Sequence, residues 1–334
     1  MRIAIDAMGG DRAPDINVSG ALRAAEVLDG HTFILVGRAD VLRRQLASAP
    51  PCISVQDAKD VIEMGEKPVD AIRAKPDSSI AVTMKLLAAG EADAAVAAGS
   101  TGAAVTAASL YLPRLPGVKR PGIAVPFPTR NGRICTLIDA GANPDPKPEH
   151  LVQYAVMASA YAKVAFGYPN PTVALLNVGS EETKGNLLVK QAKPLFEGAP
   201  INFIGNVEGR EIWGGVCDVV VCDGFTGNAV LKACEGMAYT LVELVKQHTK
   251  RRLTWMLGAL LCKSLFEAVA DVIDWSEYGG APLLGFKGIC MICHGSSDGK
   301  AIANAIRVAT EFSKARLNEQ LMEAFAGQVG GNAA

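Results

Sequence analysis

Asp218-Val-Val-Val-Cys-Asp-Gly-Phe-Thr-Gly-Asn228 joins an apolar, strand-like run to a helix-like stretch through a short polar turn. The same succession occurs at residues 2–11, 94–102 and 173–180. Apolar strands that alternate with helical patterns are typical of parallel sheets buried on both faces. The sequence therefore predicts an α/β fold, with a Rossmann-like, mostly parallel sheet and helices on both faces. Turns after the strands leave N–H groups at the carboxyl edge of the sheet, where such folds bind anions and small ligands.

Apolar runs and turn residues mark the individual elements. Strands are expected at 2–6, 33–37, 52–56, 94–98, 122–126, 134–139, 172–176, 201–205, 217–222 and 288–293. Helices are expected at 14–28, 80–90, 101–112, 148–165, 181–193, 226–248, 253–269 and 298–316. Residues 112–133, with five prolines, are predicted to be irregular or antiparallel. We expect one domain over 1–325, with a protruding helical segment around 248–272, and a flexible tail over 326–334.

Composition excludes several classes of function. The 334 residues are 49% hydrophobic and 20% charged, which is typical of a soluble globular protein. A net charge of −1 and an aromatic content of 6% argue against nucleic-acid binding. The chain enters a strand at once, and its longest apolar segment, 253–262, is too short to span a bilayer. The eight cysteines stand mostly among apolar residues and are expected to be buried thiols of a cytoplasmic protein.

Three familiar motifs occur near residue 295, and each fails on its context. Residues 290–294 have the spacing of a haem attachment site, but they continue a strand. Residues 295–299 match G-x-S-x-G, yet the last histidine of the chain precedes the serine, so the hydrolase order of residues is not available. Residues 295–300 fall one residue short of a Walker A loop, and Ala301 replaces its Ser/Thr. No dinucleotide fingerprint is present, and the sequence predicts no cofactor and no metal site.

The polar turns themselves are candidates for anion binding. Residues 98–103 place two hydroxyls and several N–H groups at a helix start, which favours an anion nest. Lys184 follows the strand end at Asn177 and offers a compact charge for a phosphate or an oxyanion. Each turn alone is equally explained as a tight strand-to-helix connection, and Lys184 as a solvated side chain. Their shared position after strands favours one composite cleft.

Taken in order, the motifs resemble those of bacterial phosphate acyltransferases, the acyl-ACP:phosphate acyltransferases of phospholipid synthesis. The motifs that carry the resemblance are Asp6-Ala-Met-Gly-Gly-Asp11, Ala98-Gly-Ser-Thr-Gly-Ala103, Asp139-Ala-Gly-Ala-Asn143, residues 175–186, Gly205-Asn-Val-Glu-Gly-Arg210, Asp223-Gly-Phe-Thr-Gly-Asn228 and Cys293-His-Gly-Ser-Ser297. The resemblance runs from residue 1 to about 315. Ser100 departs from it, since asparagine is expected there.

The resemblance implies a cytoplasmic homodimer with a fold similar to phosphotransacetylases and isocitrate dehydrogenase-like enzymes. Such an enzyme moves a fatty acyl group from acyl carrier protein (ACP) to inorganic phosphate. The catalytic residues it implies are Lys184, Asn177, Asn228 and His294. The residues it implies for binding phosphate or the thioester are Gly9, Gly10, Ser100, Thr101, Gly102, Asp139, Asn143, Gly179, Glu181, Asp223, Thr226, Ser296 and Ser297.

Residues 250–266 combine basic side chains with an apolar helix. Arg251, Arg252, Trp255, Leu257 and Leu261 would suit a peripheral contact with the inner face of the membrane, a contact with acidic ACP, or a dimer interface. Membrane association of the family favours the first. Three other functions stay open: a phosphotransacetylase that uses acyl-CoA, a hydroxy-acid dehydrogenase, and a non-catalytic scaffold that binds ACP.

Overall fold

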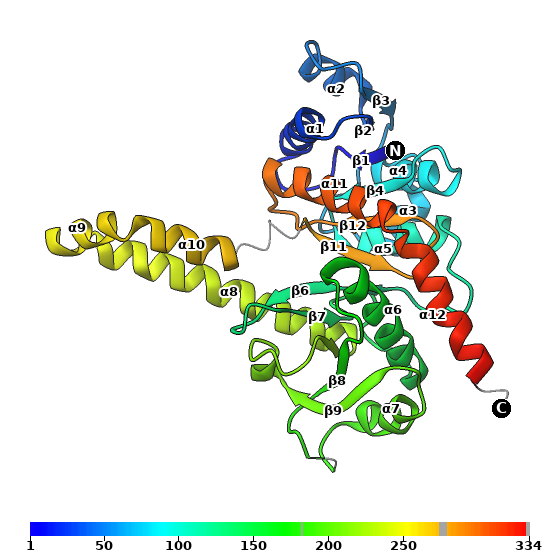
Figure 1. The fold of residues 1–334 in the computed structure, drawn as a ribbon. Coiled ribbons are helices and arrows are strands. Elements are labelled where there is room, and N and C mark those ends of the chain that lie inside the picture. Colours follow the sequence, from blue (N-terminus) through cyan, green and yellow to red (C-terminus); the bar gives the residue numbers. More distant parts are fainter. Residues whose placement is uncertain (182, 274–278, 332–334) are drawn as a thin grey trace.

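The computed structural model describes residues 1–181, 183–273 and 279–331, and it divides the strands between two sheets, one in each of two stacked lobes (Figure 1). The larger sheet has the order β3-β2-β1-β4-β12-β11-β5. Its strands are β1 (Arg2–Asp6), β2 (Thr32–Gly37), β3 (Ile53–Asp57), β4 (Ala94–Ala97), β5 (Gly122–Ile123), β11 (Ala281–Leu284) and β12 (Ile289–Ile292). Neighbours from β3 to β12 are parallel, whereas β11 and β5 add antiparallel pairs.

The smaller sheet has the order β6-β7-β10-β8-β9. Its strands are β6 (Val125–Pro128), β7 (Ile134–Ile138), β8 (Thr172–Asn177), β9 (Asn202–Glu208) and β10 (Val219–Val221). Only the β6–β7 pair is antiparallel. The predicted excursion over residues 112–133 thus supplies an antiparallel edge to each sheet.

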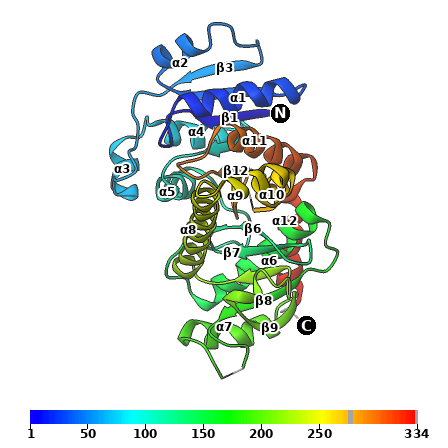
Figure 2. The same ribbon diagram turned by 90° about the vertical axis from the view of Figure 1, so that its left-hand side faces the viewer.

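Helices cover both faces of the larger sheet, as the apolar strands require. Helices α1 (Asp15–Val27) and α11 (Gly299–Lys314) pack together on one face, and α4 (Ser79–Ala88) and α5 (Thr101–Tyr111) lie on the other (Figure 2). In the second lobe α6 (Pro148–Phe166) and α7 (Leu187–Glu197) pack against the smaller sheet. The remaining helices are α2 (Ala39–Gln45), α3 (Pro68–Ala74), the short η1 (Gly209–Glu211), α8 (Gly224–Thr249), α9 (Leu253–Leu261), α10 (Lys263–Ile273) and α12 (Leu317–Gly331).

The predicted α/β class with mostly parallel strands is confirmed, but two sheets replace the single sheet that was expected. Every predicted strand is present, and β11 was missed. The helix expected from residue 181 begins at Leu187, because the Asn186 side chain caps it by accepting a hydrogen bond from the Val189 amide. Helices α2, α3 and α12 were also missed. Residues 326–331, expected in a flexible tail, continue α12, and residues 332–334 lie outside the described ranges.

A helical arm projects from the body (Figure 1). Helix α8 leaves the junction of the lobes, and α9 and α10 fold back along it. The protruding segment predicted around 248–272 therefore begins within α8. Among the described residues, no helix is both long and apolar enough to cross a membrane.

Two features tie the lobes together. Residues 122–128 supply β5 to the larger sheet and β6 to the smaller one, with only the buried Ala124 between them. Helix α12 follows the helices of the first lobe and packs against α6 of the second (Figure 1). One apolar core accordingly includes strand residues of both sheets, such as Ile5 and Val219.

Candidate active site

A cavity of about 410 Å³ lies where the two lobes meet. The carboxyl end of β12, the starts of α5 and α11, the segment that crosses between the sheets and the first half of α8 line it. Five predicted site residues border the cavity: Thr101, Asn228, His294, Ser296 and Ser297. Arg12, Lys232, Glu235 and Asp298 also border it, and none of these four was among the predicted site residues.

Tight glycine turns bring the strand ends of the larger sheet together. Gly10 has a φ of +102°, and a Cβ there would lie 2.9 Å from the Ala98 carbonyl oxygen and 3.1 Å from that of Gly295. A Cβ on Gly9 would lie 2.7 Å from an Asp6 carboxylate oxygen. The loops after β1, β4 and β12 therefore touch at their backbones, which only glycine allows. This contact places the starts of α5 and α11 at one cavity.

The start of α5 offers free backbone donors. Ser100 caps the helix, and its hydroxyl oxygen accepts a hydrogen bond from the Ala103 amide at 3.4 Å. The first amides of a helix have no partner within it, so that of Thr101, which lines the cavity, is available to a ligand, whereas Gly102 does not line the cavity. The partial positive charge of a helix N-terminus favours an anion there. Helix α11 also begins at the cavity, with Asp298 as its cap.

A chain of polar contacts connects α8 with the end of β12. Lys232 Nζ lies 2.6 Å from His294 Nε2 and 2.9 Å from Glu235 Oε2. His294 Nδ1 lies 2.7 Å from Ser296 Oγ and 3.2 Å from the Ser296 amide nitrogen. An ammonium group can only donate, so we assign Nε2 as the acceptor and place the ring proton on Nδ1, where it is donated to the hydroxyl. In this tautomer Nδ1 carries a proton, so the Ser296 amide, which is also a donor, makes no hydrogen bond to Nδ1 despite the 3.2 Å separation.

Asp139 holds the loop after β7 rather than facing the ligand. Its carboxylate accepts hydrogen bonds from the amides of Ile123, Gly141, Ala142 and Asn143 at 2.6–3.1 Å. Burial raises the pKa of Asp139 above its ordinary value, although these amide bonds act in the opposite direction. Asn143 in turn donates from its side chain to the Pro121 carbonyl at 2.6 Å. The loop is therefore fixed from within.

The start of α8 rests directly on this loop. Asp223 caps the helix and accepts hydrogen bonds from the amide and the hydroxyl of Thr226, at 2.8 and 2.7 Å. A Cβ on Gly227 would lie only 2.0 Å from the Asp139 carbonyl oxygen. Asp223 and Thr226 thus satisfy each other and orient α8, whose next turn carries Asn228 and Lys232 into the cavity.

The predicted group of Asn177, Gly179, Glu181 and Lys184 lies elsewhere. Asn177 ends β8 and the other three lie in the loop after it, and none of the four lines the cavity. A Cβ on Gly179 would lie 2.5 Å from Glu181 Oε2 and 3.3 Å from Lys184 Cγ, so the loop packs on itself. Lys184 is exposed. Within one chain, the structure therefore separates this loop from the remaining candidates.

A helical pattern could have revealed the missed residues. Lys232 stands four positions after Asn228, and Glu235 three after Lys232, so all three share one face of α8. Arg12 gives no such signal. Its Nη2 donates to the Ser297 carbonyl at 3.2 Å, a contact between loops that are 285 positions apart.

The interpretation of the cysteines in the haem-like motif is confirmed. Cys290 and Cys293 are buried in and next to β12, and burial raises the pKa of each thiol to about 12. Among the described residues, no group of three or more histidine, cysteine or acidic side chains is placed to hold a metal ion.

The two-lobed fold defines the general class. It is similar to a phosphotransacetylase from Streptococcus pyogenes, with a TM-score of 0.58 and 16% identity over 96% of this chain and 94% of that one. It is also similar to a branched-chain phosphotransacylase from Enterococcus faecalis V583, with a TM-score of 0.56 and 14% identity over 93% and 98% of the two chains. The chain therefore has a phosphotransacetylase-like fold.

Sequence comparison identifies the family within that class. The model of the family described as "Fatty acid synthesis protein" matches residues 1–320. The chain is 51% identical to the phosphate acyltransferase of Desulfitobacterium hafniense (strain Y51), over 96% of each chain. It is 47% identical to the phosphate acyltransferase of Heliobacterium modesticaldum, over 98% of this chain and 99% of the relative. The chain belongs to this family. The predictions of an enzyme, and of an acyltransferase of lipid biosynthesis, are confirmed.

Proposed function

We propose that the protein transfers a fatty acyl group from the thioester of ACP to inorganic phosphate, in the cavity between the lobes. One observation carries the proposal: two helix starts converge there with Arg12, Lys232 and His294. Fixed N–H dipoles and cationic side chains are the groups that bind phosphate. Glu235 and Asp298 reduce the net charge, but each already accepts a hydrogen bond or an ion pair from the protein.

The chemistry needs no nucleophilic side chain, because hydrogen phosphate is itself a nucleophile. A phosphate oxygen attacks the thioester carbonyl carbon, a C–O bond forms, and the C–S bond breaks. The proton of hydrogen phosphate passes to the departing thiolate, which gives acyl phosphate and ACP thiol. The protein has to aim the two reactants at each other and stabilise the oxyanion of the intermediate.

The geometry supports a division of roles. We assign phosphate binding to Arg12 and Lys232, which line the cavity, and oxyanion binding to the amide of Thr101 at the start of α5. His294, in contact with Lys232 and Ser296, is placed to carry the proton towards sulfur. Asn228 borders the same cavity and supplies a further donor. Lys184 and Asn177 remain predictions from the resemblance, and a variant of Lys184 tests them below.

The decisive assay measures release of ACP thiol from acyl-ACP with and without added phosphate. We expect release that depends on phosphate, together with formation of acyl phosphate. A second candidate function is a phosphotransacetylase that uses acyl-CoA, which the phosphotransacetylase-like fold favours. The same assay with acyl-CoA in place of acyl-ACP distinguishes the two enzymes. Equal or faster turnover of acyl-CoA would favour that enzyme. ACP binding without thiol release would instead indicate a scaffold.

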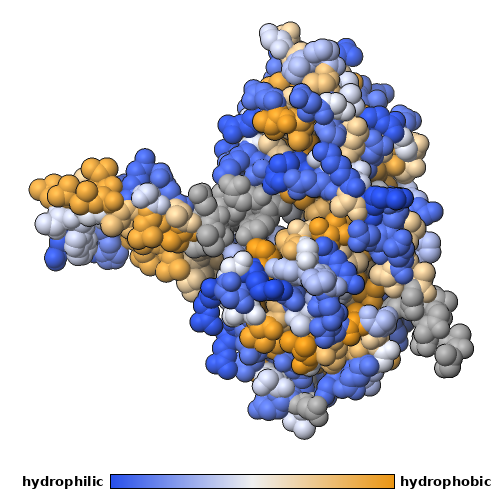
Figure 3. Space-filling view, in the orientation of Figure 1, coloured by the Kyte–Doolittle hydropathy of each residue, from blue (hydrophilic) through white to orange (hydrophobic). Residues whose placement is uncertain are grey.

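The arm supports a proposed peripheral contact with the inner face of the membrane. In α9, Leu257 and Leu261 are 61% and 77% exposed, and apolar side chains gather over this helix (Figure 3). The Arg252 guanidinium stacks over the Trp255 ring at 4.7 Å, which keeps a cation beside an interfacial aromatic side chain. Arg251, next in the chain, is exposed as well. Basic and apolar groups at one tip suit an anionic lipid surface, while ACP remains the other candidate for the arginines.

Flotation with anionic vesicles tests the membrane contact. The double variant Leu257→Glu and Leu261→Glu should no longer float with the vesicles, because membrane contact would place two charges in the apolar layer. The matched control is Val27→Glu with Met64→Glu, which alters two exposed apolar side chains of the body. Unchanged flotation of the arm variant would rule out the contact.

We also propose that the enzyme is cytoplasmic and forms a homodimer. Between the body and the tip, α8 exposes Leu241, Leu244 and Val245 by 44–55%, an apolar stretch that a second copy would cover. Light scattering should then give about twice the chain mass of 34.9 kDa. A mass equal to one chain would contradict this proposal.

A further inference from the structure

The cavity has an apolar floor that the phosphate chemistry does not use. Strands β12, β11 and β5 are adjacent in the larger sheet. Ile292 of β12 faces its cross-strand partner Ala281 of β11, and both line the cavity. Ile123 of β5 lines it too and extends the same apolar surface. Three successive strands thus form one continuous floor.

Apolar side chains also line the cavity beyond the three floor strands. Val125 and Pro126 continue the floor where the chain crosses into the smaller sheet, and both are buried. Leu231 of α8 also lines the cavity, directly before Lys232 in the chain. The cavity lining therefore combines cations and helix starts with hydrocarbon side chains, and those of β12, β11 and β5 lie on adjacent strands.

Burial costs decide which part of an acyl thioester fits the apolar strand floor. The pantetheine arm on the sulfur side carries amide groups, and an amide buried without a hydrogen-bond partner is strongly unfavourable. The side chains of Ile123, Ala281 and Ile292 offer no such partner. An acyl chain has no polar group beyond the carbonyl and gains free energy with each methylene buried.

We propose that this floor holds the acyl chain from the thioester carbonyl outwards past the fourth carbon, and that the small side chain of Ala281 sets how many methylenes beyond the butyryl length enter. This inference rests on the proposed function. Ala281 is the smallest side chain of the strand floor, and it is only partly buried, so the space above it belongs to the cavity. A larger residue would occupy that space and exclude methylenes.

Substitution at Ala281 tests the inference with butyryl-, octanoyl- and palmitoyl-ACP. Each excluded methylene should lower kcat/KM about four-fold. Ala281→Val should therefore reduce the octanoyl-to-butyryl ratio of kcat/KM about four-fold, and Ala281→Leu about sixteen-fold if two methylenes are lost. The palmitoyl-to-butyryl ratio should fall in the same order. The KM for phosphate should stay unchanged, which a general distortion of the site would not allow.

The control is Ala233→Leu, the same change at an exposed position of α8 outside the cavity. It should leave the ratios as in the wild type. Valine suits a strand, so Ala281→Val provides the test even if the leucine variant fails to fold. If a folded Ala281 variant has the same kcat/KM ratios as the wild type, the inference is overturned. An equal loss of kcat/KM with all three donors would overturn it as well. If the wild type releases no thiol when phosphate is added, the proposed function fails instead.

Discussion

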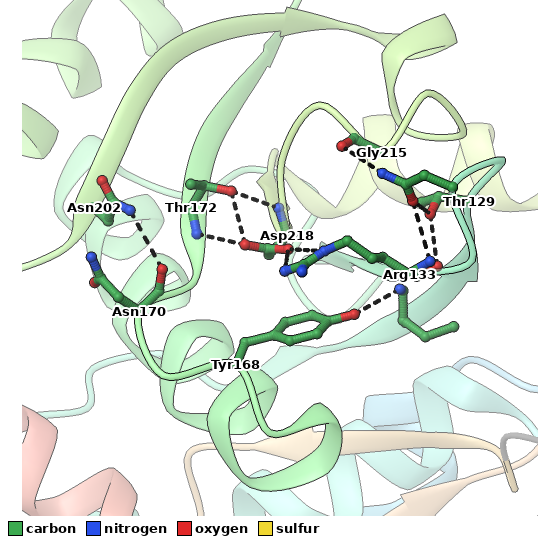
Figure 4. A network of polar contacts seen from close by, with 10 residues as sticks. Thr129, Arg133, Tyr168, Asn170, Thr172, Asn202, Gly215 and Asp218 are labelled. Atoms are coloured by element: carbon green, nitrogen blue, oxygen red, sulfur yellow. Dashed lines mark hydrogen bonds and ion pairs between the residues drawn. The ribbon is translucent and has the colours of Figure 1, made fainter.

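Each end of the five-stranded sheet buries an aspartate, and the two are held in different ways. At the amino end, Asp218 accepts hydrogen bonds from Arg133 at 2.5 and 3.2 Å and from the amide and hydroxyl of Thr172 at 2.9 Å each (Figure 4). The guanidinium also lies 4.2 Å from the centre of the Tyr168 ring. At the carboxyl end, Asp139 forms no ion pair with the described residues and accepts hydrogen bonds from neutral backbone amides.

We interpret the amino end of the smaller sheet as structural and its carboxyl end, next to the cavity, as functional. At the amino end a cation, a hydroxyl and an aromatic ring satisfy the acid and join β7, β8 and β10. At the carboxyl end the acid is held by backbone amides, so the cations Arg12 and Lys232 border the cavity instead of neutralising it. Buried charge stabilises strands at one end and shapes a loop at the other.

Removing the acid at the amino end should have the largest effect. Asp218→Ala would leave Thr172 and Arg133 without their partner, and we expect it to lower the free energy of unfolding by about 3–5 kcal/mol in urea denaturation. The matched control, Asp40→Ala, breaks the exposed pair with Arg44 and should cost at most about 1 kcal/mol. Turnover of the folded Asp218 variant should change little. A loss of activity that exceeds the loss of stability would contradict the division between the two ends.

The pH dependence of stability should reveal the acids at the carboxyl edges. Asp6 ends β1 as Asp139 follows β7, and burial raises the pKa of Asp6 from 3.8 to about 6. Between these values the folded protein binds more protons than the unfolded chain, so the free energy of unfolding falls as the pH rises through this window. The gap corresponds to roughly 3 kcal/mol at most. Urea denaturation of Asp6→Asn at pH 4 and pH 7 should show this decline removed, and an unchanged decline would refute the assignment.

Lys232 should matter for activity beyond the stability that its pair with Glu235 contributes. Lys232→Ala should lower kcat/KM about a hundred-fold, or about 2.7 kcal/mol, because it removes a charge from the reacting phosphate. The control is Lys246→Ala, further along α8 and paired with Glu243. Lys184→Ala, assayed beside them, tests the prediction made from the sequence. A similar loss would mean that the loop after β8 reaches the site of a second copy, and normal turnover would remove Lys184 from the mechanism.

The smallest expected effect concerns the packing of α8 on the Asp139 loop. In Gly227→Ala the new methyl group must displace the Asp139 carbonyl, so we expect a loss of about 1–3 kcal/mol in thermal unfolding and reduced turnover. Gly236→Ala in the same helix would place the new Cβ in open space beside the helix and should stabilise by up to about 1 kcal/mol. If the two variants behave alike, the close contact does not position the helix.

Local features of the fold were predictable, and long-range ones were not. The strand end and helix start at Asp223 could be predicted, because the residues that form this turn and cap the helix are adjacent in the sequence. The division of strands between two sheets depends on pairings such as β12 with β4, almost 200 positions apart, which no local pattern specifies. The same holds for Arg12, which reaches the cavity only through contacts between loops. Lys232 could have been predicted from the sequence, since it follows Asn228 by one helical turn.

The short crossing at residues 122–128 has a consequence for how the protein unfolds. Strands β5 and β6 belong to different sheets, yet Ala124 alone separates them, and its amide donates to Pro282 at 3.1 Å. Asp139 beside the smaller sheet also accepts the amide of Ile123 in the larger one. Loss of the edge strand from either sheet would therefore also displace the edge strand of the other sheet. Despite their two-lobed shape, the sheets should melt in one cooperative transition, as a single thermodynamic unit.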